Sequence, residues 1–299
     1  MLESCELCPR SCKANRLAGA VGYCSQSAQV KLARAALHMW EEPPISGQQG
    51  SGTVFFSGCP LHCVYCQNQP IANGSVGKVV SIERLAQIFL EQQGRGAHNI
   101  NLVTPTHFAP QIAAALDLSK SMGMDLPVVC NTSGYESAES LAVFKGYVDI
   151  YLSDFKYASS ELAERYSKAP DYPSIASAAL DEMFAQVGPY QQDPQSGLAQ
   201  RGVIVRHLLL PNCLDDSLEV MNLIASKPYA QEIVVSLMSQ YTPVPGIGNT
   251  YPELAETVDP NDYDCLVDYA LSLGLEHSFC QEGGAASESF IPSFDLEGV

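Results

Sequence analysis

Strand-like and helix-like segments alternate along most of this chain, and the alternation limits its fold more than any other feature. Short apolar runs predict six strands, at residues 53–57, 101–104, 127–130, 148–152, 203–210 and 232–237. Helices are predicted at residues 82–93, 111–122, 137–145, 161–167, 175–187, 217–227 and 259–273. Because most of these strands are joined through helices, we expect a parallel sheet with right-handed crossovers, either an open doubly wound sheet or a partial barrel.

Polar residues follow the predicted strands. Cys59 follows the first strand, the segment Thr104–Thr106 the second, the segment Asn131–Ser133 the third, and Asp154 and Lys156 the fourth. In both candidate architectures, ligands bind at the carboxyl ends of the strands. The sequence therefore predicts a site on this rim, where His107 and Tyr241 either contact the substrate or have structural roles.

Charge and hydropathy limit the partners and the location. The chain has 33 acidic and 16 basic residues, a formal charge of −17, and no run of Lys or Arg. Such a chain repels phosphate backbones, so a nucleic-acid partner is not expected. No apolar stretch is long enough to span a membrane, and the N-terminus does not resemble a signal peptide. We expect a cytoplasmic protein.

Three cysteines follow the first strand with the spacing C-x3-C-x2-C, namely Cys59, Cys63 and Cys66. Three thiolates on one loop can hold three irons of a [4Fe–4S] cluster, which leaves the fourth iron free for a small molecule. The alternative is a structural zinc site with a fourth ligand such as His62.

A second group of cysteines lies near the N-terminus: Cys5, Cys8, Cys12 and Cys24. Four thiolates form a complete set for tetrahedral zinc or for a second cluster, and the sequence leaves this choice open. We therefore predict a Cys-rich metal-binding lobe with a linker at residues 1–50 and a barrel at residues 51–240. Residues 241–299 are predicted to contain a helix and a capping tail.

The segment at residues 58–68, GCPLHCVYCQN, resembles the signature of radical S-adenosylmethionine (radical SAM) enzymes. Neighbouring segments are similar to homologues of pyruvate formate-lyase-activating enzyme. The resemblance implies an α/β fold with a partial (β/α)6 parallel barrel and a [4Fe–4S] cluster. It also implies that S-adenosylmethionine is cleaved to a 5′-deoxyadenosyl radical that abstracts hydrogen.

The resemblance also implies roles for single residues. Cys59, Cys63 and Cys66 would ligate the cluster, and Tyr65 would lie against the adenine. Thr104 and Thr106 stand where the family has the Gly-Gly-Glu segment that receives the methionine amine.

Other implied contacts lie further along the chain. Asn131 and Ser133 occupy the place of an Asp-Thr-Asn-Gly segment near the ribose, and the change of Asp to Asn makes a bound cation less expected. Asp154 and Lys156 match an Asp-x-Lys motif whose lysine pairs with the methionine carboxylate. Arg206, inside an apolar strand, needs the cofactor or a buried carboxylate as its partner.

Several functions remain open. One is activation of a partner enzyme by hydrogen abstraction from a backbone glycine, and another is chemistry on a small molecule or peptide. Both would take electrons from a flavodoxin or ferredoxin. The alternative from a different class is a non-catalytic iron–sulfur or zinc protein that acts in electron transfer or as a scaffold.

Overall fold

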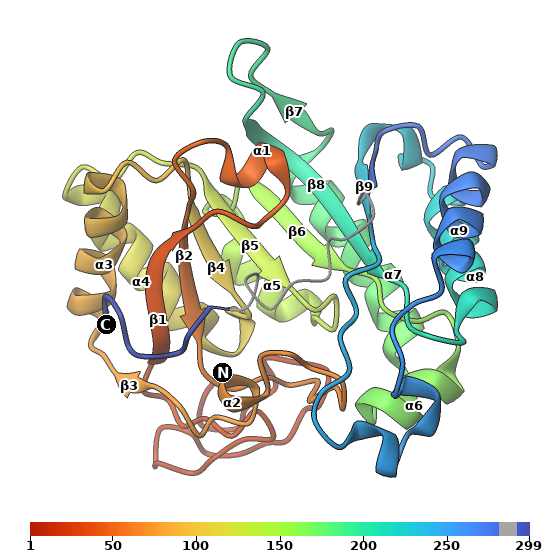
Figure 1. The fold of residues 1–299 in the computed structure, drawn as a ribbon. Helices are drawn as coiled ribbons and strands as arrows, with labels where there is room; N and C mark the ends of the chain where they lie inside the picture. Colours follow the sequence, from red (N-terminus) through yellow and green to blue (C-terminus); the bar gives the residue numbers. More distant parts are fainter. Residues whose placement is uncertain (281–291) are drawn as a thin grey trace.

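The computed structural model describes residues 1–280 and 292–299 and forms an α/β structure around one ten-stranded sheet (Figure 1). Its strands are β1 (Lys31–His38), β2 (Ser51–Phe56), β3 (Lys78–Val79), β4 (Ile100–Val103), β5 (Val128–Thr132), β6 (Ile150–Asp154), β7 (Gln191–Gln192), β8 (Ala199–Leu208), β9 (Val234–Met238) and β10 (Ser278–Cys280). Its α-helices are α1 (Pro43–Ser46), α2 (Gln69–Ala72), α3 (Ile82–Gly94), α4 (Ala109–Ser121), α5 (Ala138–Phe144), α6 (Ser160–Ser167), α7 (Tyr172–Val187), α8 (Leu214–Ala225) and α9 (Pro260–Ser272).

The predicted parallel sheet is confirmed. Strands β2, β4, β5, β6, β8 and β9 lie side by side in chain order, and every neighbouring pair among them is parallel. The order of these strands across the sheet never reverses. Right-handed crossovers between strands in such an order place the connecting helices on one face of the sheet, as in a barrel. A doubly wound sheet reverses its strand order and carries helices on both faces, so the order favours the partial barrel. No pairing joins the two sheet edges in the described part of the chain.

The two faces of the sheet have different partners. Alternate residues such as Cys130, Tyr151 and Val205 pack with the helices in the main hydrophobic core. The opposite face, called the inner face below, carries Val129, Leu152 and Ile204. Ile45 of α1 is fully buried against this face, near the amino ends of the parallel strands (Figure 1). Polar residues further along the strands, including Asp154 and Arg206, lie between this apolar layer and the carboxyl ends of the strands.

Strand β1 was not predicted, because its sequence KLARAALH is rich in residues that favour helices. It forms a strand because it pairs antiparallel with β2, with Ala35 opposite Val54. Residues 31–38, assigned from the sequence to the lobe and linker, therefore belong to the main sheet. The short helix α1 also lies in the segment that was expected to be a loop.

The C-terminal residues lie along β1. The backbone N–H of Ala35 donates to the carbonyl of Glu297 at 2.8 Å, and that of Leu296 donates to Ala33 at 3.2 Å. The Arg34 side chain pairs with Asp295 and Glu297. The rest of the predicted capping tail, residues 281–291, lies outside the described residues. Within the described ranges, none of the helices has the length and apolar character needed to cross a membrane.

Candidate active site

The loop with Cys59, Cys63 and Cys66 begins directly after β2, and the N-terminal segment lies beside it below the sheet (Figure 1). Gly58 begins the loop with a φ of 87°, a conformation that favours glycine. A Cβ at Gly58 would lie 2.3 Å from the carbonyl oxygen of Cys24, so only glycine allows this close approach. The turn is held by the backbone N–H of Cys66, which donates to the carbonyl of Cys63 at 3.2 Å.

The three thiols of the loop fit the ligand set of an iron–sulfur cluster. Burial raises the pKa of Cys59 to about 11 and that of Cys66 to about 12, and in both cases the neighbouring Cys63 raises it further. Burial and mutual repulsion both disfavour thiolates at these positions, and a bound cation would favour them. Soft thiolates select iron–sulfur clusters or zinc. In the described ranges, no three His, Cys, Asp or Glu side chains have the geometry to hold a single metal ion.

The thiols open into a cavity of about 210 Å³ on the inner face. Its walls carry most of the predicted site residues, namely Cys59, Cys63, Tyr65, Cys66, Thr104, Asn131, Ser133, Asp154, Lys156 and Arg206. The Ser133 hydroxyl oxygen is buried there without a hydrogen-bond partner. A buried polar atom without a partner is costly, and a polar ligand in the cavity would satisfy it.

Arg206 is held by three side chains from three different segments. Its Nε donates to Asp154 at 2.9 Å, one Nη donates to Asn131 at 2.6 Å, and the other donates to Glu41 at 3.3 Å. Burial alone would raise the pKa of Asp154, but Arg206 and Lys156 outweigh burial and hold it below its ordinary value. The partner that Arg206 required is therefore a pair of carboxylates, Asp154 and Glu41.

Lys156 shares Asp154 with Arg206. Its ammonium donates to the second carboxylate oxygen at 2.6 Å. Burial would lower the pKa of Lys156, but the Asp154 carboxylate outweighs this effect and raises it, so the lysine stays charged. A compact ammonium at the cavity wall can still accept a second anionic partner.

Thr104 and Thr106 have different positions. Thr104 lines the cavity and has a φ of 55°, which is rare for a β-branched residue. Thr106 is fully buried at the start of a short 3-10 helix and is not part of the cavity wall. It lies beside Glu136, whose pKa is raised to about 7 by burial, against the opposing effect of Thr106 and Thr132. Of the two threonines that were expected to face the methionine amine, only Thr104 lines the cavity. Its contact with the amine stays a prediction.

Tyr65 lies in a cluster of tyrosines. Its ring packs edge-on against Tyr157, Tyr166 and Tyr241, and its hydroxyl is hydrogen-bonded to the hydroxyl of Tyr157 at 2.7 Å. Tyr241 also lines the cavity and donates to the carbonyl of Leu254 at 2.6 Å. His107 is buried and bonds the carbonyl of Ser57 at 2.8 Å, and burial lowers its pKa to about 3. His107 is therefore a neutral, structural residue.

Comparison with known proteins identifies part of the chain. Residues 53–179 match the model of the radical SAM superfamily. This segment is a radical SAM domain. An uncharacterized protein of Methanocaldococcus jannaschii is 29% identical over 252 residues, which cover 81% of this chain and 67% of that protein.

Among solved structures, the chain is similar to the crystal structure of Streptococcus suis SuiB bound to S-adenosylmethionine. The TM-score is 0.46 and the identity 11%, over 76% of this chain and 46% of the SuiB chain. The match thus spans less than half of the SuiB chain.

The radical SAM domain supplies the cysteine loop, Asp154 and Lys156, whereas Arg206 lies beyond it on β8.

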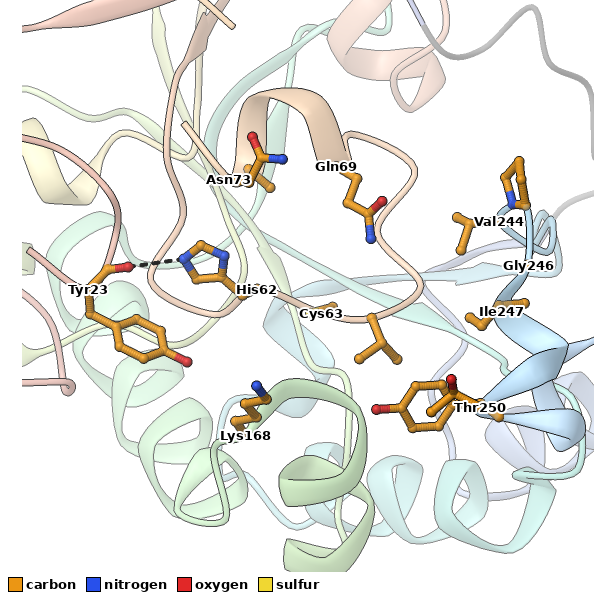
Figure 2. A pocket seen from close by; sticks show the side chains of 14 residues that line it. Tyr23, His62, Cys63, Gln69, Asn73, Lys168, Val244, Gly246, Ile247 and Thr250 are labelled. Carbon is orange, nitrogen blue, oxygen red and sulfur yellow. Dashed lines mark hydrogen bonds between the residues drawn. The ribbon is translucent and has the colours of Figure 1, made fainter. Parts of the chain in front are cut away.

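A second hollow of about 630 Å³ lies on the other side of the cysteine loop (Figure 2). Gln69 and Asn73 border it on one side, Lys168 lies opposite them, and Val244 and Ile247 form its far end. Nε2 of His62 lies 3.1 Å from the carbonyl oxygen of Tyr23, and burial lowers the pKa of His62.

The four N-terminal cysteines lie next to the radical SAM domain and approach one another. The Cys8 and Cys24 thiols have raised pKa values, chiefly because of burial, and each also interacts electrostatically with Cys5. A Cβ at Gly22 would lie 3.3 Å from Sγ of Cys12 and 3.5 Å from Sγ of Cys24, so both sulfurs lie close to this glycine. Cys12 is the exposed member of the group.

Arg10 connects this group to the cysteine loop and was missed in the sequence. Its guanidinium donates to the carbonyls of Pro60 at 2.9 Å and Ser167 at 2.9 Å, and also to that of Lys168. Glu41, Glu42 and Glu136 were missed as well. A charged side chain in a loop is usually solvated, and only the tertiary fold buries these carboxylates.

Proposed function

We propose that the chain is a radical SAM enzyme that cleaves S-adenosylmethionine reductively and abstracts a hydrogen atom from its substrate. The observation that carries this proposal is the placement of Cys59, Cys63 and Cys66 around one end of a cavity on the inner face. A [4Fe–4S] cluster ligated by these thiolates supplies an electron and a coordination position for the cofactor.

The residues around the cavity would bind the cofactor and orient it. Lys156 would pair with the methionine carboxylate, since its ammonium keeps its charge beside Asp154. The strained backbone of Thr104 would present its carbonyl to the amine, and the unpartnered Ser133 hydroxyl would bond the ribose. Tyr65, rigid among three tyrosine rings, would provide an apolar wall for the adenine.

The test is anaerobic. The protein is reconstituted with iron and sulfide, reduced with dithionite and mixed with S-adenosylmethionine, and 5′-deoxyadenosine is measured by mass spectrometry. We expect 5′-deoxyadenosine from the parent and none from the triple variant Cys59→Ala, Cys63→Ala, Cys66→Ala. A loaded and reduced parent that neither binds nor cleaves the cofactor would favour the alternative, an electron-transfer or scaffold protein.

The hollow in Figure 2 supports docking of the electron donor, a flavodoxin or ferredoxin. Cys63 lines this hollow as well as the cavity, so a donor seated there would be close to the cluster. Within the described residues no carboxylate lines the hollow, although the chain has a net charge of −17, and Lys168 contributes a positive charge. Such a surface suits an acidic donor protein.

Charge reversal tests the donor proposal. Lys168→Glu should slow reduction by flavodoxin about tenfold at low salt and leave reduction by dithionite unchanged. The exposed Lys145→Glu serves as the control, since Lys145 does not line the hollow. Equal rates for both variants would argue against docking at this hollow.

Arg16 supports a metal centre at the N-terminal cysteines. Its side chain is 1% exposed, and it donates to the carbonyls of Ser27 and His107 and to Sγ of Cys5. No carboxylate pairs with it in the described part of the chain. A buried cation needs a negative partner, and thiolates on zinc or on a second cluster would provide one.

Metal analysis of the triple cysteine variant described above tests this second site. We expect it to keep bound zinc or iron, and to lose it when Cys5 and Cys8 are also changed to Ala. The identity of the retained metal decides between zinc and a second cluster. Complete loss of metal from the triple variant would reject the N-terminal site.

A further inference from the structure

A pocket of about 360 Å³ adjoins the cofactor cavity on the inner face. The two hollows share five lining residues: Gln67, Asn68, Val103, Asn131 and Arg206. A molecule in the pocket would therefore lie next to the bound cofactor. The place is suitable for the substrate of the proposed reaction, and the inference below rests on that proposed function.

Glu42 is the unusual residue of this pocket. It is 9% exposed and lines the pocket, and its Oε2 is buried without a hydrogen-bond partner. Although Glu42 is the N-cap residue of α1, its side chain does not cap the helix. Ser236 forms a hydrogen bond with the Glu42 side chain, so the unpartnered atom is Oε2 alone. A buried carboxylate oxygen without a partner is costly, and a ligand in the pocket would supply the partner.

The other charged groups near Glu42 already have partners. The Arg206 guanidinium is bonded to Asp154, Glu41 and Asn131, and Lys156 is bonded to Asp154. Across both hollows the described charged side chains are three carboxylates and two cations, and burial raises the pKa of Glu42, so a cationic ligand beside it would favour its charged form. Glu42 is the carboxylate outside the ion-pair network.

Apolar side chains form the rest of the wall. Phe55, Met238 and Phe279 line the pocket together with the half-exposed Trp40. Such surfaces pack against an alkyl stem, and aromatic faces also attract a cation. An amine on a short carbon chain matches both parts of the pocket.

We infer that this pocket binds a substrate through a protonated nitrogen, an ammonium or guanidinium group on an apolar stem, which pairs with Glu42. The stem would contact the aromatic wall, and its carbons would lie toward the cavity that holds the cofactor. The pocket size suits a small molecule or a single side chain of such a compound.

Three probes of equal length test the inference: cadaverine, its neutral analogue 1,5-pentanediol and the dianion glutarate. Each is titrated by calorimetry into the cluster-loaded protein, with and without S-adenosylmethionine. We expect the parent to bind cadaverine at least about tenfold more tightly than the diol and to bind glutarate most weakly. Equal affinities for cadaverine and the diol would overturn the inference.

Glu42→Gln keeps the shape of the side chain and removes its charge. We expect it to weaken cadaverine binding about tenfold or more, and to change the affinities for the diol and for S-adenosylmethionine less than about twofold. The exposed Glu256→Gln is the matched control. Unchanged cadaverine binding would refute the role of Glu42, and weaker S-adenosylmethionine binding would assign Glu42 to the cofactor instead.

A second variant keeps the test decisive if Glu42→Gln does not fold. Met238→Trp would fill the pocket with Glu42 in place, and we expect it to abolish cadaverine binding as well. A parent that binds cadaverine but not S-adenosylmethionine would count against the proposed function, and not against this binding site.

Discussion

The Ser167 hydroxyl donates a hydrogen bond to Sγ of Cys63 at 3.1 Å. Ser167 is the last residue of α6, and its side chain also bonds the hydroxyl of Tyr157 at 2.8 Å. The serine therefore links a cysteine of the loop to the tyrosine cluster that contains Tyr65. A hydrogen bond to a cluster sulfur stabilises the reduced, more negative state more than the oxidised state.

Ser167→Ala should lower the reduction potential of the cluster. The loss of one hydrogen bond of about 1 kcal/mol corresponds to a shift of roughly 40 mV toward more negative values. The measurement is a redox titration followed by electron paramagnetic resonance. The control is Ser174→Ala, an exposed serine that bonds the carbonyl of Asp171. Identical potentials in both variants would show that the Ser167 bond does not affect the cluster.

Lys156→Met should weaken the binding of S-adenosylmethionine by about tenfold or more, because a charge-assisted hydrogen bond to its carboxylate is lost. The fold should persist, since Asp154 keeps its bond to Arg206. The dissociation constant is measured on the cluster-loaded protein, with the exposed Lys145→Met as the control. If Lys156→Met binds S-adenosylmethionine as tightly as the parent, the methionine carboxylate does not pair with Lys156.

The six parallel strands were predictable, because each one is a short apolar run followed by a turn. Their order was not, since the residues left a doubly wound sheet and a partial barrel open, and only the family resemblance implied the barrel. The cysteine loop was predictable for a related reason, since the spacing of Cys59, Cys63 and Cys66 is local in the sequence. Asp154 and Lys156 were named from the sequence because they come at the end of a strand and match the Asp-x-Lys motif, and their contact with the cofactor stays a prediction. These features depend on interactions between residues close in the chain.

The residues that were missed depend on pairing between distant segments. Strand β1 has a helix-like sequence and exists through its register with β2, and this pairing carries Glu41 and Glu42 onto the inner face. Arg10 donates hydrogen bonds to carbonyl groups that are 50 and 157 residues away in the chain. Every residue has a backbone carbonyl, so the sequence does not indicate which ones Arg10 binds. Thr106 lies in a 3-10 turn beside Glu136 and does not line the cavity, so its contact with the cofactor stays a prediction.

Arg206→Met should destabilise the protein by about 3 kcal/mol or more, because it leaves Glu41 and Asp154 buried beside each other with a weaker counter-charge. Adding Glu41→Gln should recover part of the loss, since one of the uncompensated charges disappears. Urea unfolding measures both effects. Arg84→Met, which removes a surface pair with Glu91, should cost less than about 1 kcal/mol. A similar cost for Arg206→Met and Arg84→Met would contradict the buried network.

Arg10→Ala should release iron from the cysteine loop faster, because it removes the bonds that join Pro60 to the end of α6. We expect the half-life of the cluster under a chelator to fall several-fold, as second-shell changes do at metal sites. Absorbance at the cluster band follows the loss. Arg201→Ala is the control, since its bonds to α7 do not involve the loop. Equal half-lives in the two variants would leave Arg10 without a role at the loop.

His207 should make the protein sensitive to acid. Burial lowers its pKa to about 4, against the opposing effect of the Phe155 carbonyl, and the ring bonds that carbonyl at 2.7 Å. Because the folded pKa lies below the unfolded value of about 6.5, the unfolded state binds the proton more readily. The stability from neutral His207 is thus complete above about pH 6.5 and is lost as the pH falls through 4.

Protonation of His207 should lower the free energy of unfolding by about 3 kcal/mol between pH 7 and pH 4. His207→Asn keeps a donor for the Phe155 carbonyl but cannot take up a proton. Between pH 7 and pH 4 the free energy of unfolding of this variant should therefore fall about 3 kcal/mol less than that of the parent. Unfolding of the metal-free chain by urea at each pH gives both curves, and subtracting them removes the effect of the carboxylates they share. The exposed His277→Asn should follow the parent. Parallel curves for the parent and His207→Asn would mean that the pKa of His207 is the same in the folded and unfolded states.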